Sequence, residues 1–286
     1  MTNTIDRKTF ERVLAQANAC TSHKADQNFN CVAFRAKGGR VEITSLDGHK
    51  LHHNTIYALD LASAIGTGRT LLLDKAHDIL RWIKALPKAA GSLSFDINGA
   101  GALRLEAAGL RCEAVSKYGD FMELDQIYAR FREIEAEAVF DGKKLIDALK
   151  QCKPYLNNYH PRAVYFDFDE NQGARLYIPP HTPAIRHEDK PNFEHDGFSL
   201  DLPCLYRGDL KTFYQGKTIN RIAYPWQNLL DLVRLTPGKD ISLQFTTMEG
   251  PSKIFGEDEN SFYVLMPMKI LDDIKYEDEA ETEAAA

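Results

Sequence analysis

The chain has 286 residues, of which 44% are hydrophobic and 27% are charged, and its formal net charge is −6. This length supports two apolar cores of ordinary domain size, and the composition is that of a soluble globular protein. No apolar run is long enough to span a bilayer, and residues 1–13 lack the apolar stretch of a secretory signal, so we expect no membrane partner. The five cysteines form no CxxC pair, which favours a reducing, cytoplasmic location.

Periodicity and turn residues predict the elements of the first half. Two amphipathic helices are expected, over 7–19 and 74–86, the second with Asp74 as its N-cap and Pro87 just beyond its end. Apolar and alternating runs predict strands near 31–36, 40–46, 53–59, 70–73, 93–97, 103–106 and 112–115. The order is helix, strands, helix, strands.

The second half repeats this order. Residues 79–95 align without a gap with 229–245, which lie 150 positions later, and 112–115 align with 262–265 at the same offset. Self-similarity at a constant offset indicates two copies of one unit. We therefore predict an α+β fold of two similar domains, each with two helices packed on antiparallel sheets. The predicted boundaries are 1–130 for the first domain, 131–137 for a linker and 138–270 for the second domain.

Two segments depart from the repeat. Residues 179–220 are richer in Pro, Gly and charge than their counterpart, and we predict a long surface loop or an inserted hairpin there. Residues 271–286 are acidic and poor in apolar side chains, so we predict a disordered tail.

The helices carry basic side chains opposite their apolar stripes. A solvated helix face is the ordinary interpretation of such a pattern. The chain is acidic overall and repeats these cations in both units, so a localised surface facing a polyanion is the alternative interpretation, and at this point both stay open. The candidates on helices are Lys8, Arg12, Lys75, Arg81, Lys84, Lys143 and Lys150, and His23 and Lys24 stand on a loop that could also reach a phosphate backbone.

Two short motifs in the chain resemble motifs of a known protein family. SLDGHKL at 45–51 resembles the (T)DGHRL motif of the bacterial DNA polymerase III beta subunit, the DNA sliding clamp, and VLMPMKI at 264–270 resembles its VMPMRL-type end. The resemblance covers about residues 5–270 and matches only the middle and last of the three domains that this family commonly has.

The resemblance implies a ring of clamp domains that encircles double-stranded DNA without reading its sequence. If the ring needs six domains, three copies of a two-domain chain close it head to tail. A dimer and a monomer that forms no ring are the alternatives at this point. The implied partners are DNA, a second and third copy of the chain, a clamp loader, and DNA polymerases and other enzymes bound through short peptides. No enzymatic activity and no cofactor are implied.

In the family, the two motifs border a hydrophobic groove for these peptides. By resemblance the groove is lined by Gly48, His49, Lys50, Leu51, Val264, Leu265, Met266, Pro267, Met268, Lys269 and Ile270. Flexible methionine side chains suit a site that accepts different apolar anchors. Beside the groove, where the family has an RFPDYRR-like stretch, this chain has the more acidic residues 120–125, so its peptide preference is expected to differ. Residues 271–276 could fold back and compete with partners.

Two other classes of function compete with a clamp. A metal-dependent enzyme could use the histidines at 49, 52 and 53, or those at 181, 187 and 195 in an acidic loop, but neither group has the spacing of a defined metal site. A non-ring accessory or decoy protein that binds clamp partners or the clamp loader would use the same fold and groove.

Overall fold

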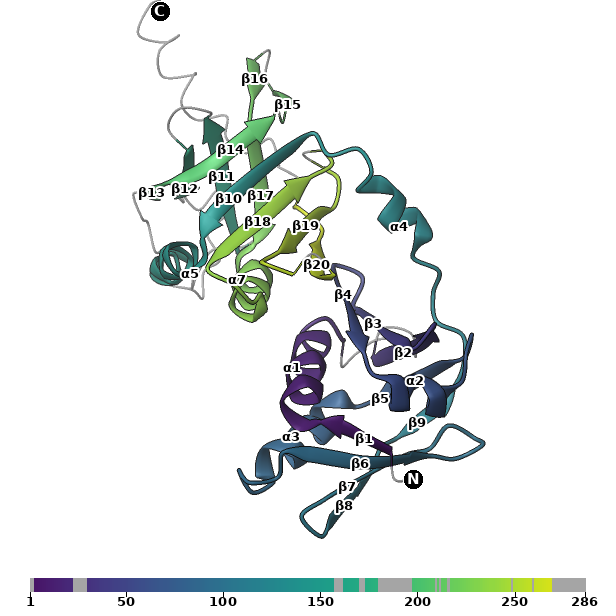
Figure 1. Cartoon of the computed structure of the whole chain (residues 1–286). Helices are drawn as coiled ribbons and strands as arrows, with labels where there is room; N and C mark the ends of the chain where they lie inside the picture. Colours follow the sequence, from purple (N-terminus) through teal and green to yellow (C-terminus); the bar gives the residue numbers. More distant parts are fainter. Residues whose placement is uncertain are drawn as a thin grey trace, which may run out of the picture.

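The computed structural model describes residues 3–22, 30–156, 162–169, 173–179, 197–208, 210, 212–214, 217–247, 249–258 and 260–268. These residues form two lobes, each with helices on antiparallel sheets (Figure 1). The predicted α+β class is therefore confirmed. Within the described part of the chain, no helix is both long and apolar enough to cross a membrane.

The first lobe contains helices α1 to α3 and strands β1 to β9. Its helices are α1 (Arg7–Asn18), α2 (Leu59–Ile65) and α3 (Ala76–Ala85). Its strands are β1 (Asn3–Asp6), β2 (Cys31–Lys37), β3 (Arg40–Leu46), β4 (Lys50–Tyr57), β5 (Thr70–Asp74), β6 (Ser92–Ile97), β7 (Leu103–Ala107), β8 (Leu110–Glu113) and β9 (Ser116–Tyr118). One apolar core joins the helices to both sheets, with Phe10, Leu14, Phe34, Ile79 and Ile83 among its buried members.

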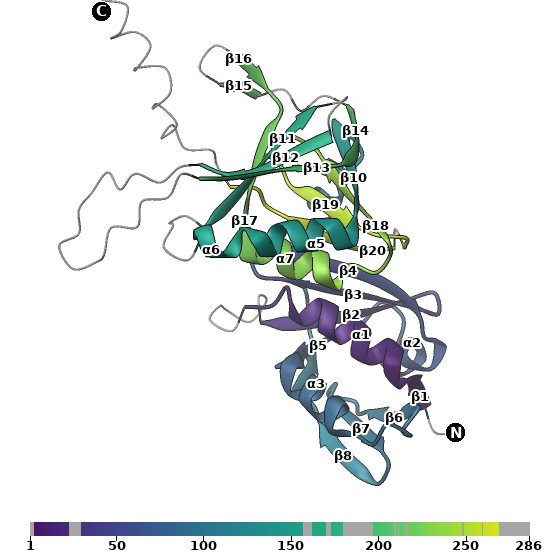
Figure 2. The ribbon, with the colours of Figure 1, turned by 90° about the vertical axis from the view of Figure 1, so that its left-hand side faces the viewer.

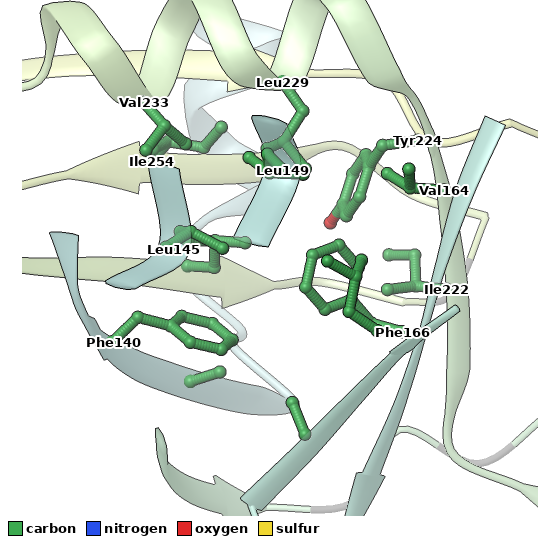
Figure 3. Packing of buried hydrophobic residues seen from close by; sticks show 14 of the residues in the cluster. Phe140, Leu145, Leu149, Val164, Phe166, Ile222, Tyr224, Leu229, Val233 and Ile254 are labelled. Atoms are coloured by element: carbon green, nitrogen blue, oxygen red, sulfur yellow. The ribbon is translucent and has the colours of Figure 1, made fainter. Parts of the chain in front are cut away.

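The second lobe contains helices α5 to α7 and strands β10 to β20. Its helices are α5 (Gly142–Gln151), α6 (Lys153–Leu156) and α7 (Trp226–Leu235). Its strands are β10 (Ala136–Asp141), β11 (Ala163–Asp169), β12 (Gly173–Ile178), β13 (Phe198–Leu202), β14 (Cys204–Gly208), β15 (Thr212–Tyr214), β16 (Lys217–Ile219), β17 (Arg221–Pro225), β18 (Asp240–Phe245), β19 (Ser252–Phe255) and β20 (Ser261–Leu265). Figure 3 shows its core, where Leu149 and Leu229 from the helices lie near Phe166 and Tyr224 from the strands.

The sheets of the two lobes repeat one topology. The order β1-β6-β7-β8 in the first lobe corresponds to β10-β18-β19-β20 in the second, and the order β4-β3-β2-β5 corresponds to β13-β12-β11-β17. The repeat that the sequence predicts is thus present in the strand pairing. The second lobe adds β14 beside β10 and a small β15–β16 hairpin.

A single strand pair joins the lobes into one ten-stranded sheet. β4 of the first lobe pairs antiparallel with β20 of the second, with Ser261 opposite Asn54 and Leu265 opposite Lys50. The chain between the lobes contains α4 (Asp125–Arg130), which lies on the side of the molecule away from α1 and α7 (Figure 1).

Several local expectations differ from the structure. Helix α3 begins at Ala76, and its N-cap is Lys75 in the left-handed region with φ 51° and no side-chain cap bond, whereas Asp74 ends strand β5. Strand β4 begins earlier than predicted, at Lys50, and helices α2 and α4 were not expected. The segment 179–220, predicted as a long surface loop or an inserted hairpin, contains sheet strands at 198–202 and 204–208 and the paired strands β15 and β16. Residues 180–196, 209, 211, 215 and 216 of this segment lie outside the described residues.

Candidate functional site

Four helices lie in succession on one face of the molecule. α1 contacts both α3 of its own lobe and α7 of the other lobe, and α5 contacts α7. Figure 2 shows the resulting row α5, α7, α1, α3, which continues across the junction of the lobes. Each helix buries an apolar stripe, so its opposite stripe is turned away from the sheets.

The outward stripes of these helices are rich in cations. All the predicted helix cations that the structure describes are exposed: Lys8, Arg12, Lys75, Arg81, Lys84, Lys143 and Lys150. Arg234 on α7 is also exposed. Some of this charge is balanced locally, since Lys150 Nζ lies 3.0 Å from Asp147 Oδ1 and Arg81 Nη1 lies 3.8 Å from Asp78 Oδ1. His23 and Lys24 fall outside the described residues.

Hydrogen bonds from side chains to backbone carbonyls hold the helices in this row. The Arg7 guanidinium donates to the carbonyls of Pro87 at 2.6 Å and Ile83 at 2.9 Å, and so satisfies the C-terminal end of α3. Gln16 Nε2 on α1 donates to the carbonyl of Leu235 at 3.2 Å, where α7 ends. Within the second lobe, Trp226 Nε1 on α7 donates to the carbonyl of Leu149 on α5 at 2.6 Å.

The first predicted motif forms the hairpin between β3 and β4. The Asp47 carboxylate accepts hydrogen bonds from the backbone of His49 and Lys50, and Gly48 takes the left-handed φ of 92° that the turn needs. The Lys50 ammonium donates to the carbonyl of Ala19 at 2.8 Å and lies 3.2 Å from Asp47. Lys50 therefore closes the C-terminal end of α1, while Gly48 and His49 are exposed.

The second predicted motif runs from β20 across the second lobe. Val264 and Leu265 are buried, as is Leu51 opposite Val264 on β4, whereas Met266 is 37% exposed and Pro267 and Met268 are half-buried. The Met266 N–H donates to His49 O at 2.9 Å, so the ends of the two motifs meet. The Met268 N–H donates to Ala223 O at 2.8 Å on β17. Lys269 and Ile270 lie outside the described residues.

The segment between the lobes covers the outer face of the β4–β20 junction. Leu124 is buried against Leu46, Leu51 and Val264, and aromatic side chains of the same segment pack beside it. Tyr128 Oη lies 3.0 Å from Nδ1 of His53, whose ring also lies 5.0 Å from the Phe262 ring. Burial lowers the pKa of His53, so this imidazole stays neutral near pH 7.

The inner face of the same junction is polar, beneath α1. Asn54 Nδ2 donates to Ser261 Oγ at 2.9 Å and lies 3.4 Å from Gln16 Oε1. Next to Asn54, His52 is fully buried and neither ring nitrogen has a hydrogen-bond partner. Burial lowers its pKa to about 3, and the nearby Tyr263 ring lies 5.2 Å away.

The metal-enzyme alternative finds no arrangement to support it in the part of the chain that the structure describes. No group of three or more His, Cys, Asp or Glu side chains there is arranged to hold a metal ion. The side chains of His52 and His53 point to opposite faces of β4, as the contacts of each show. The histidines at 181, 187 and 195 lie outside the described residues.

Sequence reasoning missed the residues that join the two lobes. Gln16, Asn54, Ser261 and Tyr128 lie far apart in the chain, and polar residues of these types are usually solvated. The sequence does show a polar residue, Asn54, at an inward-facing position of an alternating strand. This pattern predicts a buried hydrogen bond but does not identify the residue that forms it.

The two lobes and their junction have the architecture of the DNA sliding-clamp fold. The sliding clamp of Bacillus subtilis matches with a TM-score of 0.76 at 12% identity, over 95% of this chain and 65% of its own length. The DNA polymerase III beta subunit of Thermotoga maritima matches with a TM-score of 0.74 at 13% identity, over 95% of this chain and 66% of its own. A Pseudomonas aeruginosa sliding clamp bound to griselimycin matches with a TM-score of 0.70 at 15% identity, over 94% and 66%.

No protein-family model and no curated protein matches the chain. At these identities the likeness to solved structures establishes the fold. The chain spans about two thirds of the length of the clamps that it matches, for example 65% of the Bacillus subtilis chain.

Proposed function

We propose that the protein is a DNA sliding clamp: copies of the chain close head to tail into a ring around duplex DNA, and the ring tethers DNA polymerases and other DNA enzymes through short peptides. The observation that carries this proposal is the row α5, α7, α1, α3, because it puts exposed cations from both lobes on one face. The chain has a net charge of −6, and yet it gathers Lys and Arg side chains on one face. Such a face attracts a polyanion electrostatically.

The charge pattern suits a surface along which DNA can move. Lys8, Arg12, Lys84 and Lys143 project from helices and can meet phosphates without reaching base edges. Such attraction is similar at every position along the duplex, so sliding costs little free energy. The partial pairing of Lys150 with Asp147 weakens the attraction further, and retention then depends on encirclement.

The repeated topology supports a specific way of closing the ring. Within the chain, the lobes join by pairing β20 with β4, and the counterparts of these strands are β8 and β13. Among the described residues, β8 and β13 each lie at the edge of a sheet. An unpaired edge strand is a template for another strand. We infer that β8 of one copy pairs with β13 of the next and repeats the internal joint.

Stoichiometry follows from this joint. Each copy of the two-lobed chain contributes two clamp units, so a ring of six units needs three copies with cyclic symmetry. Each copy has one β8 edge and one β13 edge, and a cyclic trimer uses all of them. No enzymatic step is part of the proposal.

The peptide site is proposed where the two motifs meet. Met266 is the most exposed of the groove residues 264–268 that the structure describes, and Pro267 and Met268 continue beside it. Leu51, Val264 and Leu265 are buried and would shape the site from beneath. Exposed methionine allows repacking around different apolar anchors.

Two experiments test the proposal. The purified protein, assembled on nicked circular DNA, should stay bound through a high-salt wash and be lost when the circle is cut. Equal loss from circular and linear DNA would favour a non-ring accessory protein. The contact between copies is tested by F198C. If β8 and β13 repeat the internal joint, Cys112 and Phe198 take the positions of Tyr263 and His52, which lie opposite each other. Oxidised F198C should yield a covalent trimer, and F198C combined with C112S should not.

A further inference from the structure

The segment between the lobes is held against them mainly by side chains. It runs as an arch from β9 to β10, with α4 in the middle (Figure 1). At its two ends, the Gly119 N–H donates to Thr70 O and the Glu135 N–H donates to Phe245 O. Among the described residues, the backbone hydrogen bonds of residues 120–134 all lie within the segment itself. The segment can therefore move away from the sheets without breaking any strand pairing.

Leu124 fills an apolar position at the junction of the lobes. Its side chain is 7% exposed and packs against Leu46, Leu51 and Val264. Leu51 and Val264 belong to the two predicted motifs, come from different lobes and lie opposite each other in the β4–β20 pair. The apolar floor of the proposed peptide site is therefore already covered by a side chain of the same chain.

Tyr128 extends this cover over the neighbouring aromatic side chains. Its Oη lies 3.0 Å from His53 Nδ1, and its ring lies 5.9 Å from the Phe262 ring in an edge-on arrangement. Ile127 and Phe131 are half-buried against the same cluster. The segment thus presents a leucine and a tyrosine to the junction, as a bound peptide with an apolar and an aromatic anchor would.

Helix α4 itself contributes little to holding the segment in place. It has six residues, its N-cap Leu124 makes no side-chain cap bond, and none of its residues is buried. A helix this short is marginal in water and depends on tertiary packing. Because that packing comes from Leu124 and its half-buried neighbours, loss of the contacts at the junction should release the whole helix.

Apolar surface remains exposed beside the cover. Met122, two residues before Leu124, is 41% exposed, and Met266, two residues after Val264, is 37% exposed. Both are flexible side chains that can adapt to different apolar partners. A partner peptide can therefore make its first contacts while Leu124 is still in place.

We propose that Leu124 and Tyr128 occupy the peptide site in the free protein, and that a partner peptide binds by displacing residues 122–131. The peptide would place an apolar anchor against Leu51 and Val264 and an aromatic side chain beside Phe262. The covering segment is then a tethered competitor, and it lowers the apparent affinity by the fraction of molecules in which the site is open. The inference rests on the proposed peptide site, but not on ring closure or DNA binding.

The test uses the full chain and a fluorescent synthetic peptide with the sequence of residues 121–132, and anisotropy measures the affinity. L124S weakens the tethered competitor, so it should bind the probe about tenfold or more tightly than the unaltered protein does. L205S, which changes an exposed leucine on β14 in the same way, should bind like the unaltered protein. A probe with serine in place of its leucine should bind none of them.

A second variant loosens the cover without removing an apolar side chain from the junction. Ala129 is exposed within α4, and A129P removes a helical N–H and clashes with the preceding turn. It should also raise the affinity for the probe, and it provides the test if the unfolding curve of L124S shows that this variant does not fold. Hydrogen exchange adds a readout of displacement. In the unaltered protein, saturating probe should speed exchange in residues 125–130 and slow it in residues 261–265.

Equal affinity of the unaltered protein, L124S and A129P for the probe would overturn the inference and leave the peptide site standing. Slower exchange in residues 125–130 on binding would also overturn it, because the segment would then be part of a preformed site. If the probe bound no protein, the inference and the peptide site would fall together. Retention on circular DNA is measured separately and is unaffected by any of these results.

Discussion

Asn54 on β4 donates a hydrogen bond from Nδ2 to the Ser261 hydroxyl on β20 at 2.9 Å, although 207 residues separate them in the chain. Both side chains are almost fully buried at the joint of the two lobes. A buried hydrogen bond makes a modest net contribution to the free energy of unfolding. A buried polar group that lacks its hydrogen-bond partner costs more, because folding also removes it from water. This pair therefore favours the observed register of β4 against β20 over a shifted one.

Loss of either partner should weaken the joint. We expect N54A and S261A each to lower the free energy of unfolding by about 1–3 kcal/mol, because the remaining partner stays buried and loses this hydrogen bond. The double variant should lose less than the sum of the two, with a coupling energy of about 0.5–3 kcal/mol. Urea unfolding measures all four proteins. Strict additivity would show that the two side chains do not stabilise each other.

Burial of neutral His52 makes stability depend on pH. Its folded-state pKa of about 3 lies below the usual value of 6.5, so the unfolded chain binds a proton over a range where the folded chain does not. The contribution of neutral His52 to the free energy of unfolding is therefore fully present above about pH 6.5. As the pH decreases toward 3, this contribution is lost by up to about 1.4 kcal/mol per pH unit. His53, whose pKa is also lowered, adds to the effect with the same sign.

The contribution of His52 is isolated by H52L. Between pH 7 and pH 5, the free energy of unfolding of H52L should decrease less than that of the unaltered protein. Chemical denaturation at a series of pH values provides the comparison. Parallel curves for the two proteins would mean that His52 does not remain neutral in the folded state.

Arg7 and Lys8 are neighbours with separate expected roles. The Arg7 side chain is 12% exposed and its guanidinium satisfies carbonyls at the end of α3, so R7M should lower the free energy of unfolding by about 2–3 kcal/mol. Lys8 is exposed, and K8M should leave stability within about 0.5 kcal/mol. Thermal and urea unfolding measure both. If K8M destabilised the protein as much as R7M, the distinction between a structural and a solvent-facing cation would fail.

Under the proposed function, the helix cations set the salt dependence of DNA binding. Each phosphate contact contributes about 0.9 to the slope of log affinity against log salt concentration, so R12Q combined with K84Q should reduce the slope by up to about 2. The matched control is R132Q, which removes an exposed cation from the segment between the lobes. The slopes are obtained by measuring the DNA affinity of each variant and of the unaltered protein at several salt concentrations. An equal change in R132Q would mean that the attraction is not localised on the helices.

The sequence predicted the main helices and strands because periodic apolar residues and a gap-free internal repeat report local structure directly. Helix α2 was missed because it is short and its N-cap, Ala58, makes no side-chain cap bond. The N-terminal end of α3 was misplaced because Asp74 has the chemistry of a cap, yet it belongs to β5, where it pairs with Cys31.

The candidate site was predictable in part. The exposed cations follow from helix periodicity, and the two motifs pointed to one location, where His49 O meets the N–H of Met266. That Lys50 would reach Ala19 O, and that Leu124 and Tyr128 would cover the junction, depends on contacts between distant parts of the chain. No local pattern encodes such contacts.

Closure of the ring is tested most directly by the mass of the assembled protein in solution. Sedimentation velocity or native mass spectrometry at micromolar concentration should give three times the subunit mass of 32.3 kDa. A species that stays at the mass of a single chain at every protein concentration would contradict the ring, and a dimer would contradict closure through three β8–β13 contacts.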